Sequence, residues 1–114
     1  MRTMLLAALA AIVITAGARA EEAGDAARGR QLFAAVGCYQ CHGYLGQGSV
    51  QSGPRLAPDP MPLESLRMVL RQPINVMPAY AESALSDRDA ADIHAYLASI
   101  PKPLPVKDIK LLNQ

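Results

Sequence analysis

The chain has 114 residues, 11 of them basic and 10 acidic, so its formal net charge is +1 with both histidines neutral. A charge balance this close to zero argues against nucleic acid or an acidic membrane surface as the main partner. The length suffices for one domain, and one phenylalanine, four tyrosines and no tryptophan make a thin aromatic core. A domain this small often needs a cofactor, a metal or a cross-link to complete its core.

Residues 1–20 have the layout of a secretory signal. Arg2 gives a short positive start, residues 4–15 are almost wholly apolar, and residues 18–20 read Ala-Arg-Ala, with small residues at both positions of a cleavage site. The apolar run is short compared with the roughly 20 residues that span a bilayer, which disfavours a retained membrane anchor. We therefore predict cleavage before Glu21, export to the periplasm, and no membrane span in the mature protein.

Helical periodicity dominates the following residues, and no segment shows convincing strand alternation. A first helix is expected over about residues 25–36, with Asp25 as its N-cap and Gly37 as its stop. A second helix is expected over residues 62–71, because Pro62 suits a first helical turn and the next proline disfavours continuation.

A third helix is the best defined. Ser86 and Asp89 have the spacing of a capping box, and Pro101 ends the helical pattern. Two irregular segments, 43–60 and 74–84, separate the three helices. We expect an all-α domain over residues 21–100, followed by a Pro-rich, polyproline-type arm over residues 101–114.

Residues 38–42 read Cys-Tyr-Gln-Cys-His, the signature of covalent haem attachment. Two thiols at this spacing can reach the two vinyl groups of one porphyrin and form thioethers, which assigns Cys38 and Cys41 to the haem. His42 is then carried beneath the ring, where its imidazole can bind the iron as the proximal axial ligand. Covalent attachment would keep one haem c in a domain too small to enclose it.

Three other uses of the cysteines fit less well. A thioredoxin-like redox pair would follow a strand in an α/β pattern, which this chain lacks. A zinc site needs two more ligands, and His94 is the only histidine besides His42. A simple disulfide between Cys38 and Cys41 would close too small a loop to constrain much chain.

Electron carriers usually provide the iron with a second strong ligand, and a methionine sulfur raises the reduction potential. Met77 is the expected distal ligand, because it follows the second helix in a proline-bounded loop. Met68 falls on that helix, where methionine is more often a core residue. Met61 precedes the helix and has little chain with which to cross to the opposite haem face. His94 and an open sixth position are the remaining alternatives.

Beyond the haem motif, the chain resembles the class I cytochrome c family from about Gly24 to Ile100. Members carry a glycine and, four residues later, an aromatic residue before the cysteines, and Gly29 and Phe33 match this pattern. The last helix of the family carries an aromatic residue that packs over the glycine, and Tyr96 matches it. The resemblance implies a cytochrome c fold, with three to four short helices around one covalent haem and the terminal helices crossing.

The resemblance also implies roles for residues in both loops. Residues 53–56 resemble the family's loop in which the proline carbonyl accepts the proton of the axial histidine, a role that falls to Pro54. Met77 with Tyr80 resembles the methionine loop of the shorter bacterial members, so Tyr80 is expected at the haem. Many members use a tryptophan near a haem propionate, and this chain has none.

Arg55 and Arg71 are the expected substitutes for that tryptophan. Either guanidinium can pair a propionate carboxylate by a charge-assisted hydrogen bond. An ordinary solvated surface role is an equally open interpretation of both arginines.

These features predict a carrier of single electrons and not an enzyme by itself, since no proton shuttle or nucleophile is visible. We expect redox protein partners: the chain would be the electron-accepting cytochrome subunit or partner of a periplasmic dehydrogenase, with a downstream cytochrome or oxidase. A freely diffusing carrier to a terminal oxidase is the main alternative, and a haem enzyme or sensor with an open sixth position is the second. Tyr39, Gln40 and Ala79 are expected to make small apolar contacts in brief redox encounters.

Overall fold

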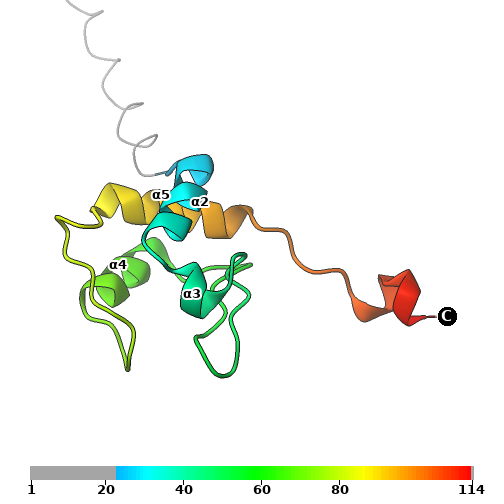
Figure 1. Ribbon diagram of the computed structural model, residues 1–114. Helices are drawn as coiled ribbons and strands as arrows, with labels where there is room; N and C mark the ends of the chain where they lie inside the picture. Colours follow the sequence, from blue (N-terminus) through cyan, green and yellow to red (C-terminus); the bar gives the residue numbers. More distant parts are fainter. Residues whose placement is uncertain (1–22, 114) are drawn as a thin grey trace, which may run out of the picture.

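A computed structural model describes residues 23–113 (Figure 1), so the predicted signal and its cleavage point lie outside the described residues. Within this range the chain forms helices and 3-10 turns, and no strand beyond an isolated bridge between Ser49 and Gly53. The predicted all-α class is confirmed. The elements in chain order are α2 (Ala26–Ala35), α3 (Tyr39–His42), α4 (Leu63–Arg71), α5 (Asp87–Ser99), η1 (Val106–Asp108) and η2 (Lys110–Leu112).

The helix ends follow the local capping signals. The Asp25 side chain accepts hydrogen bonds from the backbone N–H groups of Ala27 and Arg28, so it is the N-cap of α2. Ser86 and Asp89 form both halves of a capping box at the start of α5. Pro62 is the N-cap of α4 and not its first helical residue, a shift of one position from the prediction.

The terminal helices α2 and α5 cross closely, as Figure 1 shows. Gly29 makes the crossing possible, because a Cβ at this position would lie 1.9 Å from the backbone oxygen of Asp92. One turn further along both helices, the rings of Phe33 and Tyr96 pack edge to face with centroids 5.6 Å apart. The glycine therefore contacts backbone, and the aromatic pair forms the adjacent layer of the core.

A buried carboxylate ties the start of α2 to α5. Asp92 is fully buried and accepts a 2.6 Å hydrogen bond from the backbone N–H of Asp25. Arg28 and Arg88 pair with its two oxygens. Burial by itself would raise the pKa of Asp92, but these donors outweigh it and hold the pKa below its usual value.

The core continues from the crossing onto α4. Its remaining members are small and aliphatic side chains from α4, α5 and the segments before them, each less than 8% exposed: Ala57, Leu66, Leu70, Leu85, Ala90, Ile93 and Leu97. Beyond Ile100 the chain leaves this body and runs outward to the two 3-10 turns (Figure 1). The helical body therefore presents α3 and the two long loops on the side away from the crossing.

Candidate functional site

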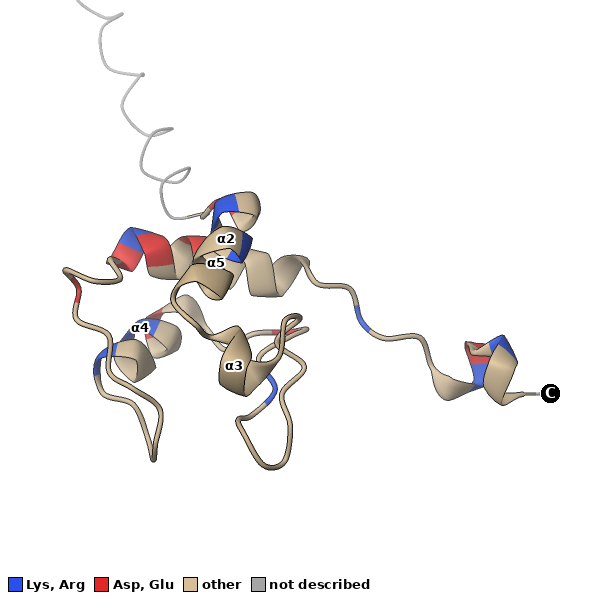
Figure 2. Cartoon of the chain, in the orientation of Figure 1, with Lys and Arg blue, Asp and Glu red and all other residues tan. Residues whose placement is uncertain are grey.

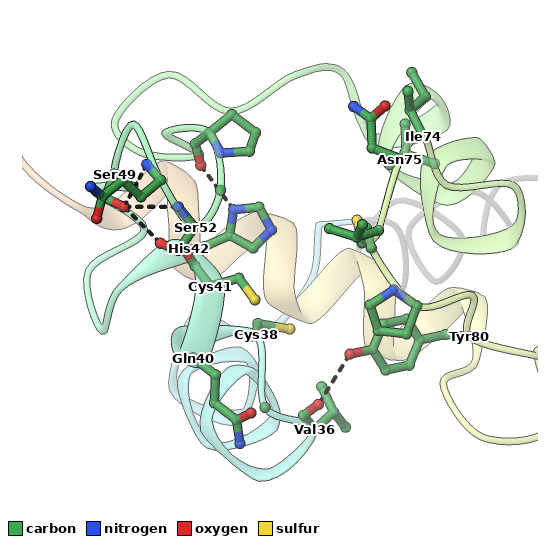
Figure 3. A pocket seen from close by; sticks show the side chains of 18 of the residues that line it. Val36, Cys38, Gln40, Cys41, His42, Ser49, Ser52, Ile74, Asn75 and Tyr80 are labelled. Carbon is green, nitrogen blue, oxygen red and sulfur yellow. Dashed lines mark hydrogen bonds between the residues drawn. The ribbon is translucent and has the colours of Figure 1, made fainter.

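A pocket of about 940 Å³ opens between α3 and the two long loops. Figure 3 shows the Cys38, Cys41 and His42 side chains on one side of it and the segment from Ile74 to Tyr80 on the other. Its lining is mostly apolar or uncharged: Val36, Gly37, Cys38, Gln40, Cys41, His42, Ser49, Val50, Gln51, Ser52, Gly53, Pro54, Met61, Val69, Ile74, Asn75, Val76, Met77, Pro78 and Tyr80. The folded chain thus brings both cysteines, the histidine and two methionines to one cavity.

The two cysteines are held by a single helical turn, α3, for which Cys38 is the N-cap. The backbone oxygen of Cys38 accepts a 3.0 Å bond from the His42 N–H, which fixes the motif's three functional side chains in one turn. Both cysteines are free thiols, and Figure 3 shows both facing the pocket. The sequence analysis missed α3, because four residues are too few to show helical periodicity.

The Cys38 thiol is not activated as a nucleophile. It is half-buried, and burial raises its pKa to about 11. Redox-active Cys-x-x-Cys pairs instead depend on a thiol whose pKa is lowered. This environment argues against the thioredoxin-like alternative and is compatible with a thiol that ends as a thioether.

His42 is buried, with 8% of its surface exposed, and a hydrogen bond from its Nδ1 holds the ring in place. Nδ1 lies 2.8 Å from the backbone oxygen of Pro54. A carbonyl can only accept, so Nδ1 carries the proton and donates, and Nε2 is left with its lone pair. This is the contact that the family resemblance implies for Pro54, and it prepares the imidazole to bind a metal through Nε2.

The loop that carries Pro54 is fastened directly to the haem motif. Ser52 Oγ donates a 2.7 Å hydrogen bond to the Cys41 oxygen, and the Gly48 N–H donates a 2.7 Å bond to the His42 oxygen. At Gly53 a Cβ would lie 3.1 Å from His42 Nδ1, so glycine lets the loop approach the ring. Sequence analysis missed Ser52 and, although it placed Gly53 in the family's loop, gave no role to that glycine, since both contacts join positions 11 residues apart.

Met77 and Met61 line the pocket, whereas Met68 lies outside it and is 65% exposed. The structure therefore separates Met68 from the candidate ligands. Met77 is also partly buried against the hydrophobic core. His94 does not line the pocket, and its Nε2 lies 3.0 Å from the backbone oxygen of Met61. The assignment of the distal ligand to Met77 stays a prediction.

Tyr80 closes the pocket on the methionine side. Its hydroxyl donates a 3.1 Å hydrogen bond to the Val36 oxygen, and its backbone N–H donates a 2.8 Å bond to the Leu70 oxygen. Burial, and then the two cysteine thiols, raise the pKa of its hydroxyl. Tyr80 therefore links the methionine loop both to the end of α2 and to α4.

Arg55 and Arg71 do not line the pocket. Arg71 donates a 3.1 Å bond to the Tyr80 oxygen and pairs with Asp87 at 2.7 Å, so its guanidinium supports the methionine loop from outside. Arg55 is exposed. No charged side chain occurs among the described residues that line the pocket. A role of either arginine at a haem propionate stays a prediction.

The donor set fits a covalently attached haem. Two thiols, an imidazole with a free Nε2 lone pair and two methionine thioethers line one largely apolar cavity. Within residues 23–113, no group of three or more His, Cys, Asp and Glu side chains could hold a metal ion by itself. A zinc site built from these residues therefore has no support.

A protein-family model described as cytochrome c oxidase, cbb3-type, subunit III matches residues 24–97. The match covers more than half of the chain and includes the haem motif, Met77, all of α2 and most of α5. The chain belongs to this family of class I c-type cytochrome domains. A search of curated proteins and a search of solved structures find no match.

Membership defines the general chemistry of the pocket. A cytochrome c domain binds haem c and transfers electrons, so this chain is an electron-transfer domain. The family's printed name also points to redox partners in a respiratory context. No helix of the cytochrome domain or its arm, over residues 23–113, is long and apolar enough to cross a membrane.

Proposed function

We propose that the chain is a periplasmic carrier of single electrons with one haem c joined to Cys38 and Cys41. His42 and Met77 are its axial iron ligands. It acts as the electron-accepting subunit or partner of a periplasmic dehydrogenase and passes electrons to a downstream cytochrome or oxidase. The observation that carries the proposal is the buried His42 ring, which donates from Nδ1 to Pro54 and faces the cysteine-lined pocket.

The bound haem supplies a site that gains or loses one electron at its iron. The chain's own residues fix the surroundings of that site. Pro54 sets the tautomer and orientation of His42, and Ser52 fastens the same loop to the haem motif. Tyr80 fastens the opposite loop, so that the two loops enclose a cavity with little charge.

Export is part of the proposal because haem c is attached outside the cytoplasm. The support comes from residues 1–20, with their positive start, apolar run and Ala-Arg-Ala end. The two cysteines of the whole sequence allow one doubly linked haem.

Two other functions compete with the proposed role as a dehydrogenase partner. The family's printed name belongs to an oxidase subunit, which favours a terminal oxidase as the acceptor and is compatible with a freely diffusing carrier. A haem enzyme or sensor with an open sixth position is less favoured, since two methionines line the pocket.

Spectroscopy of the exported protein tests the site. Full-length chain produced with haem c maturation machinery should show a reversible one-electron couple and, when oxidised, a far-red sulfur-to-iron band. Met77→Ala should abolish the band and lower the reduction potential, because the thioether ligand is lost. Met68→Ala, on an exposed helix face, should change neither. Loss of the band in Met61→Ala instead would reassign the ligand to Met61.

Carbon monoxide binding tests the alternative of a haem iron with an open sixth position. With a thioether on the iron, the unmutated reduced protein should bind carbon monoxide slowly or not at all, and Met77→Ala should bind it rapidly. Rapid binding by the unmutated protein would overturn the proposed ligation.

A further inference from the structure

The C-terminal arm, residues 101–113, leaves the cytochrome domain after Ile100 and contacts it through an ion pair between Lys102 and Asp59, 3.0 Å apart. Its residues are exposed except for the half-buried Ile109. Alternating prolines at 101, 103 and 105 favour a stiff, extended stem. In Figure 1 this stem leads from the end of α5 to the two 3-10 turns, well apart from the helices.

The end of the arm is held together by its own hydrogen bonds. The side-chain amide of Asn113 donates to the backbone oxygens of Val106 and Ile109, at 2.8 and 3.0 Å. The Asp108 N–H donates a 2.8 Å bond to the oxygen of Pro105. The arm is thus a compact knob on a stiff stem, which reduces the conformational entropy lost when it binds.

The surface of the knob and stem is apolar and basic. Four aliphatic side chains of the arm are each at least 64% exposed: Leu104, Val106, Leu111 and Leu112. All three lysines of the protein lie here, Lys102, Lys107 and Lys110, against a single acid, Asp108, so the arm carries a net charge of +2 (Figure 2). Residues 23–100 have six arginines and seven acids, a net charge of −1.

The mouth of the haem pocket is also apolar, but it carries no charge. Val50, Ile74 and Val76 line it and are each at least 72% exposed, and its described lining includes no charged side chain. A partner that docks on this mouth meets apolar surface with no charge to steer it. The attraction that raises the rate of encounter must then come from elsewhere on the molecule.

We propose that residues 101–113 are a docking arm that binds an apolar groove with an acidic rim on the redox partner, while the uncharged pocket mouth makes the contact for electron transfer. The inference rests on the proposed function, since it concerns the partner of that same site. Lys107 and Lys110 supply attraction, since Lys102 is paired with Asp59, and the exposed aliphatic side chains supply the buried contact. Because redox interfaces are small, a second contact outside the pocket mouth lengthens the encounter.

A partner protein fits the arm better than a lipid surface does. Interfacial segments are typically amphipathic helices with aromatic anchors, and this arm has proline-broken turns and no aromatic residue. A second copy of the chain fits less well too, because the cytochrome domain's own net charge is close to zero.

Stopped-flow reduction of the full-length holoprotein tests the proposal, with the purified dehydrogenase that reduces it as the electron donor. We expect Lys107→Gln/Lys110→Gln to lower the second-order rate constant about threefold to tenfold at low salt, and to flatten its dependence on ionic strength. Val106→Ser/Leu111→Ser should lower it at every salt concentration. Arg30→Gln, which removes an exposed charge from α2, is the matched control and should leave the rate nearly unchanged.

Reduction by an uncharged quinol separates failure of the arm from failure of the haem site. All four proteins should react equally with the quinol, and a holoprotein that no reductant reduces would contradict the proposed function itself. Equal rates with the dehydrogenase for the arm variants and the unmutated protein would overturn the docking arm. Arm-dependent sedimentation with phosphatidylglycerol vesicles, or arm-dependent dimerisation in light scattering, with no effect on the dehydrogenase rate, would overturn it in favour of a lipid surface or a second copy.

Discussion

The α2–α5 crossing and the pocket side of this small domain are stabilised by different kinds of contact. At the crossing, Gly29 lies against the Asp92 backbone and Phe33 packs on Tyr96, with nearly all the surface buried. On the pocket side, a few separate hydrogen bonds hold the loops in place of packed side chains. Aliphatic side chains such as Val50 and Val76 remain exposed there. One side fills its own core, and the other leaves a cavity of about 940 Å³ for the haem that its family binds.

The difference predicts where substitutions act. Changes at the crossing should lower the free energy of unfolding strongly, because dense packing leaves no room for adjustment. Changes on the pocket side should cost less stability and should act mainly on the environment of the haem.

The largest effect is expected for Gly29→Val. Any Cβ at residue 29 would lie 1.9 Å from the Asp92 oxygen, so α2 and α5 must separate. We expect a loss of about 3 kcal/mol or more in the free energy of unfolding, measured by denaturant titration of the holoprotein. Ala34→Val on the exposed face of the same helix should cost about 0.5 kcal/mol. Equal losses for the two variants would mean that the helices do not cross at Gly29.

Asp92→Asn should have the next largest effect. The carboxylate is fully buried and accepts from Arg28, Arg88 and the Asp25 N–H; an amide has no charge for the two ion pairs and only one oxygen to accept these bonds. We expect about 2–3 kcal/mol of destabilisation at pH 7 by denaturant titration. Asp108→Asn, in the exposed arm, should change stability little.

The pH dependence of the free energy of unfolding, compared between the unmutated protein and Asp92→Asn, gives a second test. Because the pKa of Asp92 is lower in the folded state, its stabilisation is complete above the unfolded pKa of about 4 and is lost as the pH falls through the folded pKa. The unmutated protein should therefore lose stability in acid more steeply than Asp92→Asn. Parallel acid-side curves would contradict the assigned role of this carboxylate.

Among Gly29→Val, Asp92→Asn and Tyr80→Phe, the tyrosine substitution should have the smallest effect on stability. It removes the hydroxyl that donates to the Val36 oxygen, and we expect a loss of about 1 kcal/mol. Because Tyr80 anchors the methionine loop, the far-red band of the oxidised protein should also shift. Tyr39→Phe, on a ring stacked against Tyr44, is the control for removing a hydroxyl. A larger stability loss at Tyr80 than at Gly29 would reverse the contrast between the two sides.

How much of the helix crossing and of the pocket the sequence predicts depends on how far apart in the chain the contacting residues lie. The ends of α2 and α5 follow from Asp25 and the Ser86–Asp89 box, whose partners lie two or three residues away. The haem motif is likewise local. The bond from the Asp25 N–H to Asp92 spans 67 residues, and no periodicity or capping rule reveals it.

The pocket side shows the same limit. The contact of His42 with Pro54 was predicted through a family resemblance, and physical reasoning on the residues alone would not have found it. The presence of both Met61 and Met77 in the pocket lining depends on how the two loops fold together. The fastening of the 43–60 loop by Ser52 is invisible in sequence for the same reason.

The intact mass of the protein, exported with haem c maturation machinery and measured in denaturant, tests the central claim most directly. We expect the mass of residues 21–114 plus one haem, with the haem retained because two thioethers hold it. Replacing both Cys38 and Cys41 by alanine should give the bare chain. A bare chain from the unmutated sequence, in cells that load a control c-type cytochrome, would contradict covalent haem attachment at this site.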